Sequence, residues 1–238
     1  MSKDGLCDPL GVARVIAGLD AELSQLGFAT ALSEDLAAFG MVKQSVRKEK
    51  PTPFFDPAVN SSMGGRYFWM SLTDKSGATT GLQAFRIDSV DSSLADWALS
   101  YTIGLYMRRQ EILVPLHPSP PRGSIAERIN GKLVYHGELW VDRAIRNRRT
   151  VEVFGRLGML LSLIRWNPDA IWALASQSMA THGHLNRMGF GYLERGFFRW
   201  QWGSEGMDAV EWVAIAERAG LELMVEEMLT TPQQSRQA

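Results

Sequence analysis

The most constraining feature of the chain is the succession of apolar patterns between residues 132 and 176. Residues 132–141 (KLVYHGELWV) are typical of a strand, and residues 150–166 place apolar side chains three and four positions apart, which predicts a helix. Residues 170–176 (AIWALAS) predict a short buried strand. A strand, a helix and a second strand at these spacings fit one crossover unit with parallel strands, so the sequence predicts an α/β fold.

Further elements are predicted on both sides of this unit. Residues 66–88 have the pattern of a β-hairpin around the turn TDKSG, and residues 92–110 return to helical spacing. Residues 177–188 predict a short helix that ends at Gly189, and the aromatic run 191–202 predicts a final strand. A hairpin followed by alternating strands and helices is typical of an α/β sandwich.

The patterns divide the chain into three parts. Residues 1–52 predict an N-terminal helical segment, in which residues 10–28 form an amphipathic helix and residues 29–50 a second helix or turn. Residues 53–203 predict the main domain, entered through the proline-rich stretch PTPFFDP, which we interpret as a linker. Residues 204–238 predict an acidic, amphipathic helical tail.

Charge and cysteine content narrow the class of protein. Lys and Arg number 25 against 26 Asp and Glu, so the chain is not a bulk polyanion binder and we expect no nucleic acid partner. Cys7 is the single cysteine, which excludes an intrachain disulfide and a Cys-clustered zinc site. The four histidines lack ligand-like spacing, so we expect no metal. With no signal peptide and no apolar run near the ~20 residues of a membrane span, we expect a cytoplasmic protein.

The richest candidate binding segment lies directly before the helix 150–166. It reads VDRAIRNRRTV and holds Arg143, Arg146, Arg148 and Arg149. A helix N-terminus offers unpaired N–H groups to an anion, and guanidinium groups suit phosphate. A phosphorylated ligand is one interpretation, and a solvated turn whose arginines pair with nearby carboxylates is the other. The sequence contains no GxxxxGK[ST], GxGxxG, HExxH or GxSxG motif.

Residues 132–200 resemble the core of the GCN5-related N-acetyltransferase (GNAT) superfamily. The matching pieces are GELWVDRAIRNRR, the helix 150–166, AIWALAS and QSMATHGHLNRMGFGYLE, whose Gly189-Phe190 step matches the family's recurrent Gly-Phe. In element order the resemblance covers residues 66–200. It implies a mixed, mostly antiparallel central sheet flanked by helices, here with an N-terminal helical extension. It also implies an acyltransferase that moves an acyl group from acyl-CoA to an amine within a ternary complex.

The resemblance implies which residues hold the donor, acetyl-CoA or a longer acyl-CoA. The family's pyrophosphate turn, Gln/Arg-x-x-Gly-x-Gly/Ala, falls here on Arg146, Asn147, Arg148, Arg149, Thr150 and Val151. The backbone of the preceding strand near Trp140, Val141 and Asp142 would hold the pantetheine arm and polarise the thioester carbonyl. Both family glycines are replaced by larger residues. Either arginine side chains substitute for backbone contacts, or the donor is not free coenzyme A, or catalysis has been lost.

Two candidate catalytic residues follow from the same resemblance. Glu138 lies on the strand that runs beside the thioester in the family, where a Glu takes the proton of the incoming amine. Alternation along HGELWV places His136 on the same face, and the competing interpretation is a salt-bridged Glu at a strand edge. The family's general-acid Tyr position is Leu185 here, and His184 beside it is the candidate for proton transfer.

Residues 91–124 form a longer link than the family usually has at this point. They hold Arg108 and Arg109, which in one alternative dock an acyl carrier protein, as in N-acyl amino acid or acyl-homoserine lactone synthases. A second alternative is a catalytically degenerate binding or regulatory module. The expected acceptor is a small-molecule amine or amino acid, and a homodimer is left open.

Overall fold

One central sheet organises the protein. The computed structural model describes residues 8–60, 65–145 and 148–230, and these form an eight-stranded sheet in the order β1-β2-β3-β5-β6-β8-β7-β4. The strands are β1 (Ala29–Ser33), β2 (Tyr67–Thr73), β3 (Thr79–Val90), β4 (Val114–Pro115), β5 (Gly131–Val141), β6 (Ala170–Ala175), β7 (Tyr192–Trp202) and β8 (Val210–Glu217).

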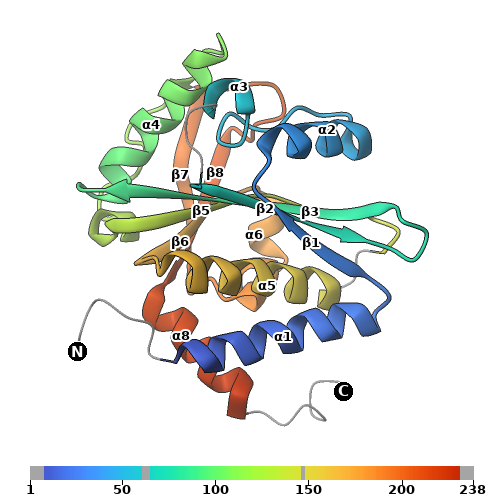
Figure 1. Ribbon diagram of the computed structural model, residues 1–238. Coiled ribbons are helices and arrows are strands. Elements are labelled where there is room, and N and C mark those ends of the chain that lie inside the picture. Colours follow the sequence, from blue (N-terminus) through green and yellow to red (C-terminus); the bar gives the residue numbers. More distant parts are fainter. Residues whose placement is uncertain (1–7, 61–64, 146–147, 231–238) are drawn as a thin grey trace.

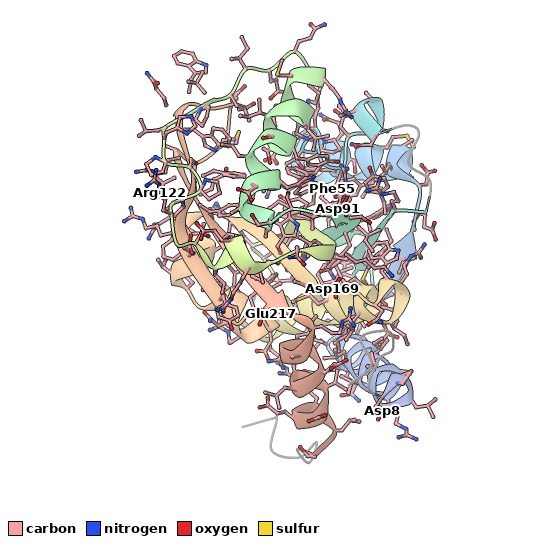
Figure 2. The ribbon with its side chains drawn as sticks, turned by 90° about the vertical axis from the view of Figure 1, so that its left-hand side faces the viewer. Asp8, Phe55, Asp91, Arg122, Asp169 and Glu217 are labelled. Carbon is pink, nitrogen blue, oxygen red and sulfur yellow. The ribbon has the colours of Figure 1, made fainter. Side chains whose placement is uncertain are left out.

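Helices cover both faces of this sheet (Figure 1). They are α1 (Pro9–Gln25), α2 (Leu36–Arg47), α3 (Pro57–Asn60), α4 (Leu94–Arg108), α5 (Arg148–Trp166), α6 (Gln177–Thr181), α7 (His184–Met188) and α8 (Arg218–Thr230), with a 3-10 helix at Ile125–Arg128. Helices α1, α5 and α8 lie on one face, the α5 face, and α2, α3 and α4 on the other, the α2/α4 face. Figure 2 shows Phe55 in the upper layer and Asp8, the N-cap of α1, in the lower one.

The strand directions confirm the predicted fold class. Every paired neighbour is antiparallel except β5 and β6, which run parallel and are joined by α5. The crossover predicted from the patterns of residues 132–176 is therefore present. The sheet is mixed, mostly antiparallel and flanked by helices, as the resemblance implied.

Residues 29–33 and the C-terminal tail differ from the sequence prediction. Residues 29–33, expected in a second helix or turn, form the edge strand β1 through pairing with β2. The tail expected to be wholly helical contains β8, which lies between β6 and β7 in the sheet. Its run from Val213 to Ala216 is buried on both faces, so β8 lacks the alternation of a half-exposed strand and was not distinguishable from a helix by period.

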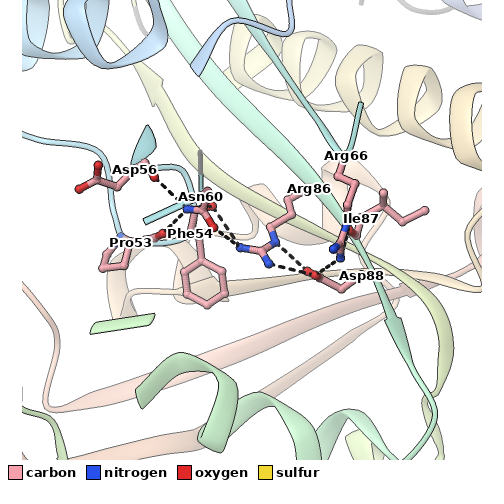
Figure 3. A network of polar contacts seen from close by, with 8 residues as sticks. All are labelled: Pro53, Phe54, Asp56, Asn60, Arg66, Arg86, Ile87 and Asp88. Atoms are coloured by element: carbon pink, nitrogen blue, oxygen red, sulfur yellow. Dashed lines mark hydrogen bonds and ion pairs between the residues drawn. The ribbon is translucent and has the colours of Figure 1, made fainter. Parts of the chain in front are cut away.

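The stretch PTPFFDP is not a linker, because its aromatic side chains belong to the core. Phe54 and Phe55 are buried, and both stack on Tyr135 of β5 with ring centroids 4.2 and 5.8 Å apart. The Asn60 amide donates to the carbonyls of Pro53 (2.7 Å) and Asp56 (2.9 Å), which holds this irregular backbone in place (Figure 3).

A buried ion pair anchors this segment to β3 (Figure 3). Arg86 is fully buried; its guanidinium group donates to Asp88 Oδ1 at 3.0 Å and to the Asn60 side-chain oxygen at 3.1 Å. Arg66 reaches the same carboxylate at 2.5 Å. Burial raises the pKa of Asp88, and the two guanidinium groups act against that rise. The polar network thus fixes the chain entering β2 against the sheet.

Helix α5 packs so closely on the sheet that one of its positions has no room for a side chain. A Cβ added at Gly158 would lie 2.5 Å from the Phe85 ring and 2.7 Å from the Gln83 amide, both on β3. Gln83 also donates to the Phe154 carbonyl of α5 at 2.7 Å, which joins helix and sheet within the core. This close approach fixes how near the middle of α5 lies to β3.

We predict opposite effects for two glycine-to-alanine substitutions in helices. Gly158→Ala overpacks the α5–β3 contact and lowers the free energy of unfolding by about 1–3 kcal/mol. Gly104→Ala in α4, where nothing lies within 4 Å of the added methyl, raises it by up to about 1 kcal/mol through helix propensity. Urea denaturation measures both, and a neutral Gly158→Ala would contradict the close packing.

Candidate functional site

The candidate site begins where β5 and β6 part. The two strands pair at three positions, Leu133 with Ala170, Val134 with Ile171 and Tyr135 with Trp172. Beyond them, in the described part of the chain, residues 136–141 of β5 and 173–175 of β6 have no partner on each other. We call these residues the open edge. Buried backbone N–H and C=O groups require partners, so such an edge is suited to an extended ligand.

A β-bulge in β5 lies beside the open edge. Gly137 pairs with Ala84 and Trp140 with Leu82, so Glu138 and Leu139 together face one residue of β3. Glu138 has φ 59°, a left-handed conformation that is uncommon for a non-glycine residue. A bulge adds a residue and turns the following side chains.

The bulge overturns the predicted pairing of His136 with Glu138. His136 stacks on Phe85 and Phe190 in the core of the α5 face. Glu138 instead points to the α2/α4 face, where it meets α2 and the backbone of Thr52. Simple alternation placed the two side chains together, and the extra residue of the bulge separates them.

Both carboxylate oxygens of Glu138 are occupied. Oε2 pairs with the Lys43 ammonium of α2, and Oε1 accepts the Thr52 N–H at 2.6 Å. The side chains of Lys43 and Glu138 are only 10% and 4% exposed. The salt-bridged alternative for Glu138 is therefore the observed arrangement, and its proposed role as a base requires that an incoming amine displace one of these donors.

A small cavity adjoins this ion pair. Its volume is about 100 Å³, and its lining combines charged and apolar side chains: Lys43, Arg47, Glu49, Leu82, Glu138, Leu139 and Trp140. Arg47 lies over the Trp140 ring at 5.8 Å and pairs with Glu49 at 2.8 Å. Trp140, one of the residues expected beside the pantetheine arm, thus directs its ring toward α2.

His136 is a buried neutral ring. It is 3% exposed, its ring centroid lies 4.3 Å from that of Phe85, and its Nε2 has no hydrogen-bond partner among the described residues. Burial lowers its pKa to about 3. His136 therefore stays uncharged near neutral pH and serves packing.

The turn before α5 is partly closed by its own contacts. The Asp142 N–H donates to the Thr80 carbonyl at 2.8 Å, and the Asp142 carboxylate accepts the Ala144 N–H at 2.8 Å. Because neighbouring residues of a strand present their backbone groups to opposite edges, Val141 presents its own to the open edge. Arg146 and Asn147, expected to hold phosphate, lie outside the described residues.

The side chains at the two family glycine positions point away from this turn. Arg149 forks onto Glu22 of α1, with NH2 at 2.6 Å from Oε2, and reaches Glu152 at 3.1 Å. Val151 is buried in the core of the α5 face, and Thr150 is also buried. Helix α5 begins at Arg148, so the first-turn N–H groups of these expected residues belong to its N-terminus.

His184 lies on the opposite face of the sheet from Glu138. It is partly buried at the start of α7, where its Nδ1 is 3.2 Å from a guanidinium nitrogen of Arg187. The neighbouring Leu185 packs in the core of the α5 face. The structure therefore does not bring together the candidate acid and the candidate base.

One carboxyl group at the site was missed by the sequence analysis. Glu211 is the second residue of β8, and its Oε2 accepts the Trp200 indole N–H at 2.7 Å. Burial raises the pKa of Glu211 to about 7. Because residues 204–238 were expected to be helical, the strand alternation that places Glu211 on the α2/α4 face was not available from the sequence.

The part of the chain that the structure describes contains neither a candidate metal site nor a candidate membrane-spanning helix. No group of three or more His, Cys, Asp or Glu side chains there could hold a metal ion. None of the helices in residues 8–60, 65–145 and 148–230 has the length and apolar character needed to cross a membrane.

Comparison with known proteins finds similarity in structure only. No protein-family model and no curated protein matches the sequence. FeeM, an N-acyl amino acid synthase from uncultured soil microbes, matches at 12% identity and a TM-score of 0.44, over 88% of this chain and 97% of that chain. Arabidopsis thaliana NAA60 in complex with acetyl-CoA matches at 15% and 0.43, over 80% and 98%. A mutant of the spermidine N-acetyltransferase SpeG from Vibrio cholerae matches at 11% and 0.46, over 82% and 96%.

These likenesses concern the fold alone, and at such TM-scores they carry no weight for substrate or activity. The chain's own strand order and its β5–α5–β6 crossover carry the conclusion about fold. The succession that the sequence resemblance rested on, from the strand 132–141 to a last aromatic strand, is present in order, except that the single short helix expected over 177–188 is two helices, α6 and α7. The resemblance to the GNAT superfamily is confirmed at the level of the fold.

We predict that the Lys43–Glu138 pair is strongly coupled. Glu138→Gln leaves the Lys43 ammonium without its buried counter-charge and lowers the free energy of unfolding by about 3 kcal/mol. The double variant Lys43→Met/Glu138→Gln recovers most of that loss, since no isolated charge remains. Urea denaturation of the two single variants and the double variant measures the coupling, and additive losses would show that the pair is not formed.

His136 makes stability fall with acidity. Its folded pKa of about 3 lies below the unfolded value of 6.5, so the unfolded chain takes up the proton first as pH drops. This residue alone removes about 2 kcal/mol of stability at pH 5 relative to neutral pH. His136→Phe keeps the stack and should flatten the pH dependence of the urea midpoint between pH 7 and 5. An unchanged slope in that variant would mean that His136 is already charged in the folded state.

Proposed function

We propose that this protein is an acyltransferase that moves an acyl group from a thioester to an amine. The observation that carries the proposal is the parting of β5 and β6 after Tyr135, next to the N-terminus of α5. An open strand edge beside a helix N-terminus can bind an extended, amide-containing arm and an anion together. The arm of a thioester carrier has both features.

In this proposal the donor's arm lies along the open edge of β5. The backbone of Val141 faces that edge, and an N–H group there would stabilise the negative charge that develops on the thioester oxygen. The Asp142 N–H is already bonded to Thr80, so of the three expected residues Asp142 contributes least. Trp140 has the same strand parity as Asp142, so its backbone also faces β3, and its ring is directed toward α2; it would flank the arm without bonding to it.

The phosphates of the donor would lie at the turn before α5. Residues 146–151 remain the proposed grip, with backbone N–H groups as the main donors and the exposed Arg143 as an additional cation. Arg149 joins them only if it leaves Glu22, because its guanidinium group is already bonded to that carboxylate. The replacement of both family glycines does not fill the turn with side chains, because Arg149 and Val151 direct theirs away from it.

The donor is either acyl-CoA or an acyl carrier protein. Helix α4, in the long link between β3 and β5, lies on the α2/α4 face, and Arg109 at its end bonds the Pro51 carbonyl at 2.7 Å. In this proposal the link covers the acceptor side of the sheet, and the bond of Arg109 to Pro51 favours a part in that cover over a docking patch. The acceptor would be a small amine or amino acid that enters from this face.

Calorimetric titration with acetyl-, medium- and long-chain acyl-CoA tests the donor. We expect saturable binding of at least one of them, weakened several-fold by Arg143→Ala through loss of a phosphate contact. Arg122→Ala, an exposed arginine in the 91–124 link (Figure 2), is the matched control and should bind as the wild type does.

The remaining outcomes separate the alternatives. Binding of an acylated carrier protein without binding of any acyl-CoA would select the carrier-dependent synthase. Binding of neither donor would contradict the acyltransferase proposal and favour a regulatory module of the same fold.

A further inference from the structure

We infer that Glu211, and not Glu138, accepts the proton that the acceptor amine loses. This inference rests on the proposed acyl transfer and assigns the general base within it. Two glutamates lie on the α2/α4 face near the open edge, and they differ in whether their carboxylates have room for a further partner.

The register of β8 places Glu211 at the mouth of the site. The last β6–β8 pair joins Ala175 to Trp212, so Glu211 lies one residue beyond the end of β6. Alternation gives Glu211 the same face as Val213, which is packed in the core of the α2/α4 face. Glu138 leaves β5 on that same face. The two glutamates thus flank the parted strands, one beside each.

The carboxylate of Glu211 has an oxygen to spare. Within residues 8–60, 65–145 and 148–230, the Trp200 indole is its one hydrogen-bond donor, through Oε2. Glu138, by contrast, has a partner on each oxygen, one of them an ammonium group. A base requires a lone pair within reach of the amine, and the geometry favours Glu211.

The surroundings of Glu211 suit proton transfer near neutral pH. The residue is partly exposed, while its carboxyl group lies deep enough for burial to be the main cause that raises its pKa to about 7. The Trp200 hydrogen bond lowers that pKa and Asp208 raises it. The hydroxyls of Tyr106 on α4 and Tyr135 on β5 interact electrostatically with the same carboxyl, and both have raised pKa values, so they stay neutral.

Polar contacts of the residues that follow α4 connect the elements around Glu211. Arg109 bonds the Pro51 carbonyl at 2.7 Å and the Glu111 carboxylate at 2.8 Å. Glu111 in turn accepts the Ser204 hydroxyl from the loop between β7 and β8. The segment beside Glu138 and the loop before Glu211 are therefore linked through one chain of polar contacts, which holds the approach to both carboxylates in a fixed shape.

The proposed step balances as a proton transfer coupled to aminolysis. An ammonium acceptor gives one proton to the Glu211 carboxylate and becomes a neutral amine. The amine nitrogen forms a bond to the thioester carbonyl carbon, and the carbon–sulfur bond breaks with its electron pair on sulfur. The second proton lost by nitrogen ends on the thiolate, and Glu211 returns its proton to solvent.

Steady-state kinetics over pH test the assignment, with acyl-CoA or acylated carrier protein as donor and a panel of amines as acceptors. The wild type should show kcat/KM rising with pH through about 7, because the base must be deprotonated. Glu211→Gln should lose that limb and about 100-fold in kcat, with donor affinity unchanged. Glu205→Gln, an exposed residue in the neighbouring loop, is the matched control and should keep the full profile.

A second variant distinguishes a base from a residue that merely supports the fold. Trp200→Phe removes the hydrogen bond that lowers the pKa of Glu211, so the acidic limb should move to higher pH while activity at its plateau remains. If Glu211→Gln and Trp200→Phe both transfer acyl groups at the wild-type rate, and both keep the acidic limb of kcat/KM at its wild-type pH, the inference is overturned. The acyltransferase proposal then remains intact.

NMR titration of side-chain ¹³C-labelled glutamates gives a readout independent of turnover. The resonance missing from Glu211→Gln should titrate near pH 7 in the wild type. Titration at the ordinary glutamate value would overturn the role of Glu211 whatever the activity. A wild type that transfers no acyl group from any donor would overturn the proposed function, and this role with it.

Discussion

The site depends on the unequal pairing of strand β5. One edge of β5 is bonded to β3 along nearly its whole length, while the other pairs with β6 at three positions and is then released. An unpaired strand edge inside a sheet is normally closed by another strand or covered. Here the crossover helix α5 connects β5 to β6, and its N-terminus follows the released end of β5. The functional proposals follow from this one departure from regular pairing.

The two faces of the sheet differ in chemistry. The core of the α5 face is largely apolar, and the buried ring of His136 is held neutral between phenylalanines. The α2/α4 face contains the Lys43–Glu138 pair, the Arg86–Asp88 pair and the carboxyl of Glu211. In the described residues, these two buried ion pairs and the carboxyl of Glu211 therefore lie on the same side of the sheet. That side is therefore the one on which a carboxylate can accept the proton that the acceptor loses.

The fold was predictable where the periodic patterns were local and long. The hairpin, α4, β5, α5, β6 and β7 were all anticipated, because each has a run whose period or apolar content identifies it. Strand β1 and strand β8 were not, since each is specified by its neighbours in the sheet more than by its own residues. The buried Phe54 and Phe55 were hidden by the prolines around them, which indicated a linker.

The site was less predictable, because its geometry depends on contacts between distant residues. Lys43 meets Glu138 across 95 positions of sequence, and Glu22 meets Arg149 across 127. The bulge at Glu138 cannot be predicted from strand alternation, and it places Glu138 and His136 on opposite faces of the sheet. The resemblance directed attention to β5 and to the turn before α5, while the partners that decide what each residue can do came from the folded structure.

The contact between Glu22 and Arg149 gives the N-terminal helix a role beyond packing. Helix α1 lies against α5 outside the sheet, and its Glu22 carboxylate binds the guanidinium group of Arg149 in the first turn of α5. A phosphate that recruits Arg149 therefore competes with an anion of the same chain, at an effective concentration set by the fold. Both side chains are about one-third exposed, so dissolved salt weakens this internal rival. Binding of a phosphate to Arg149 and the contact of α1 with Arg149 consequently exclude each other.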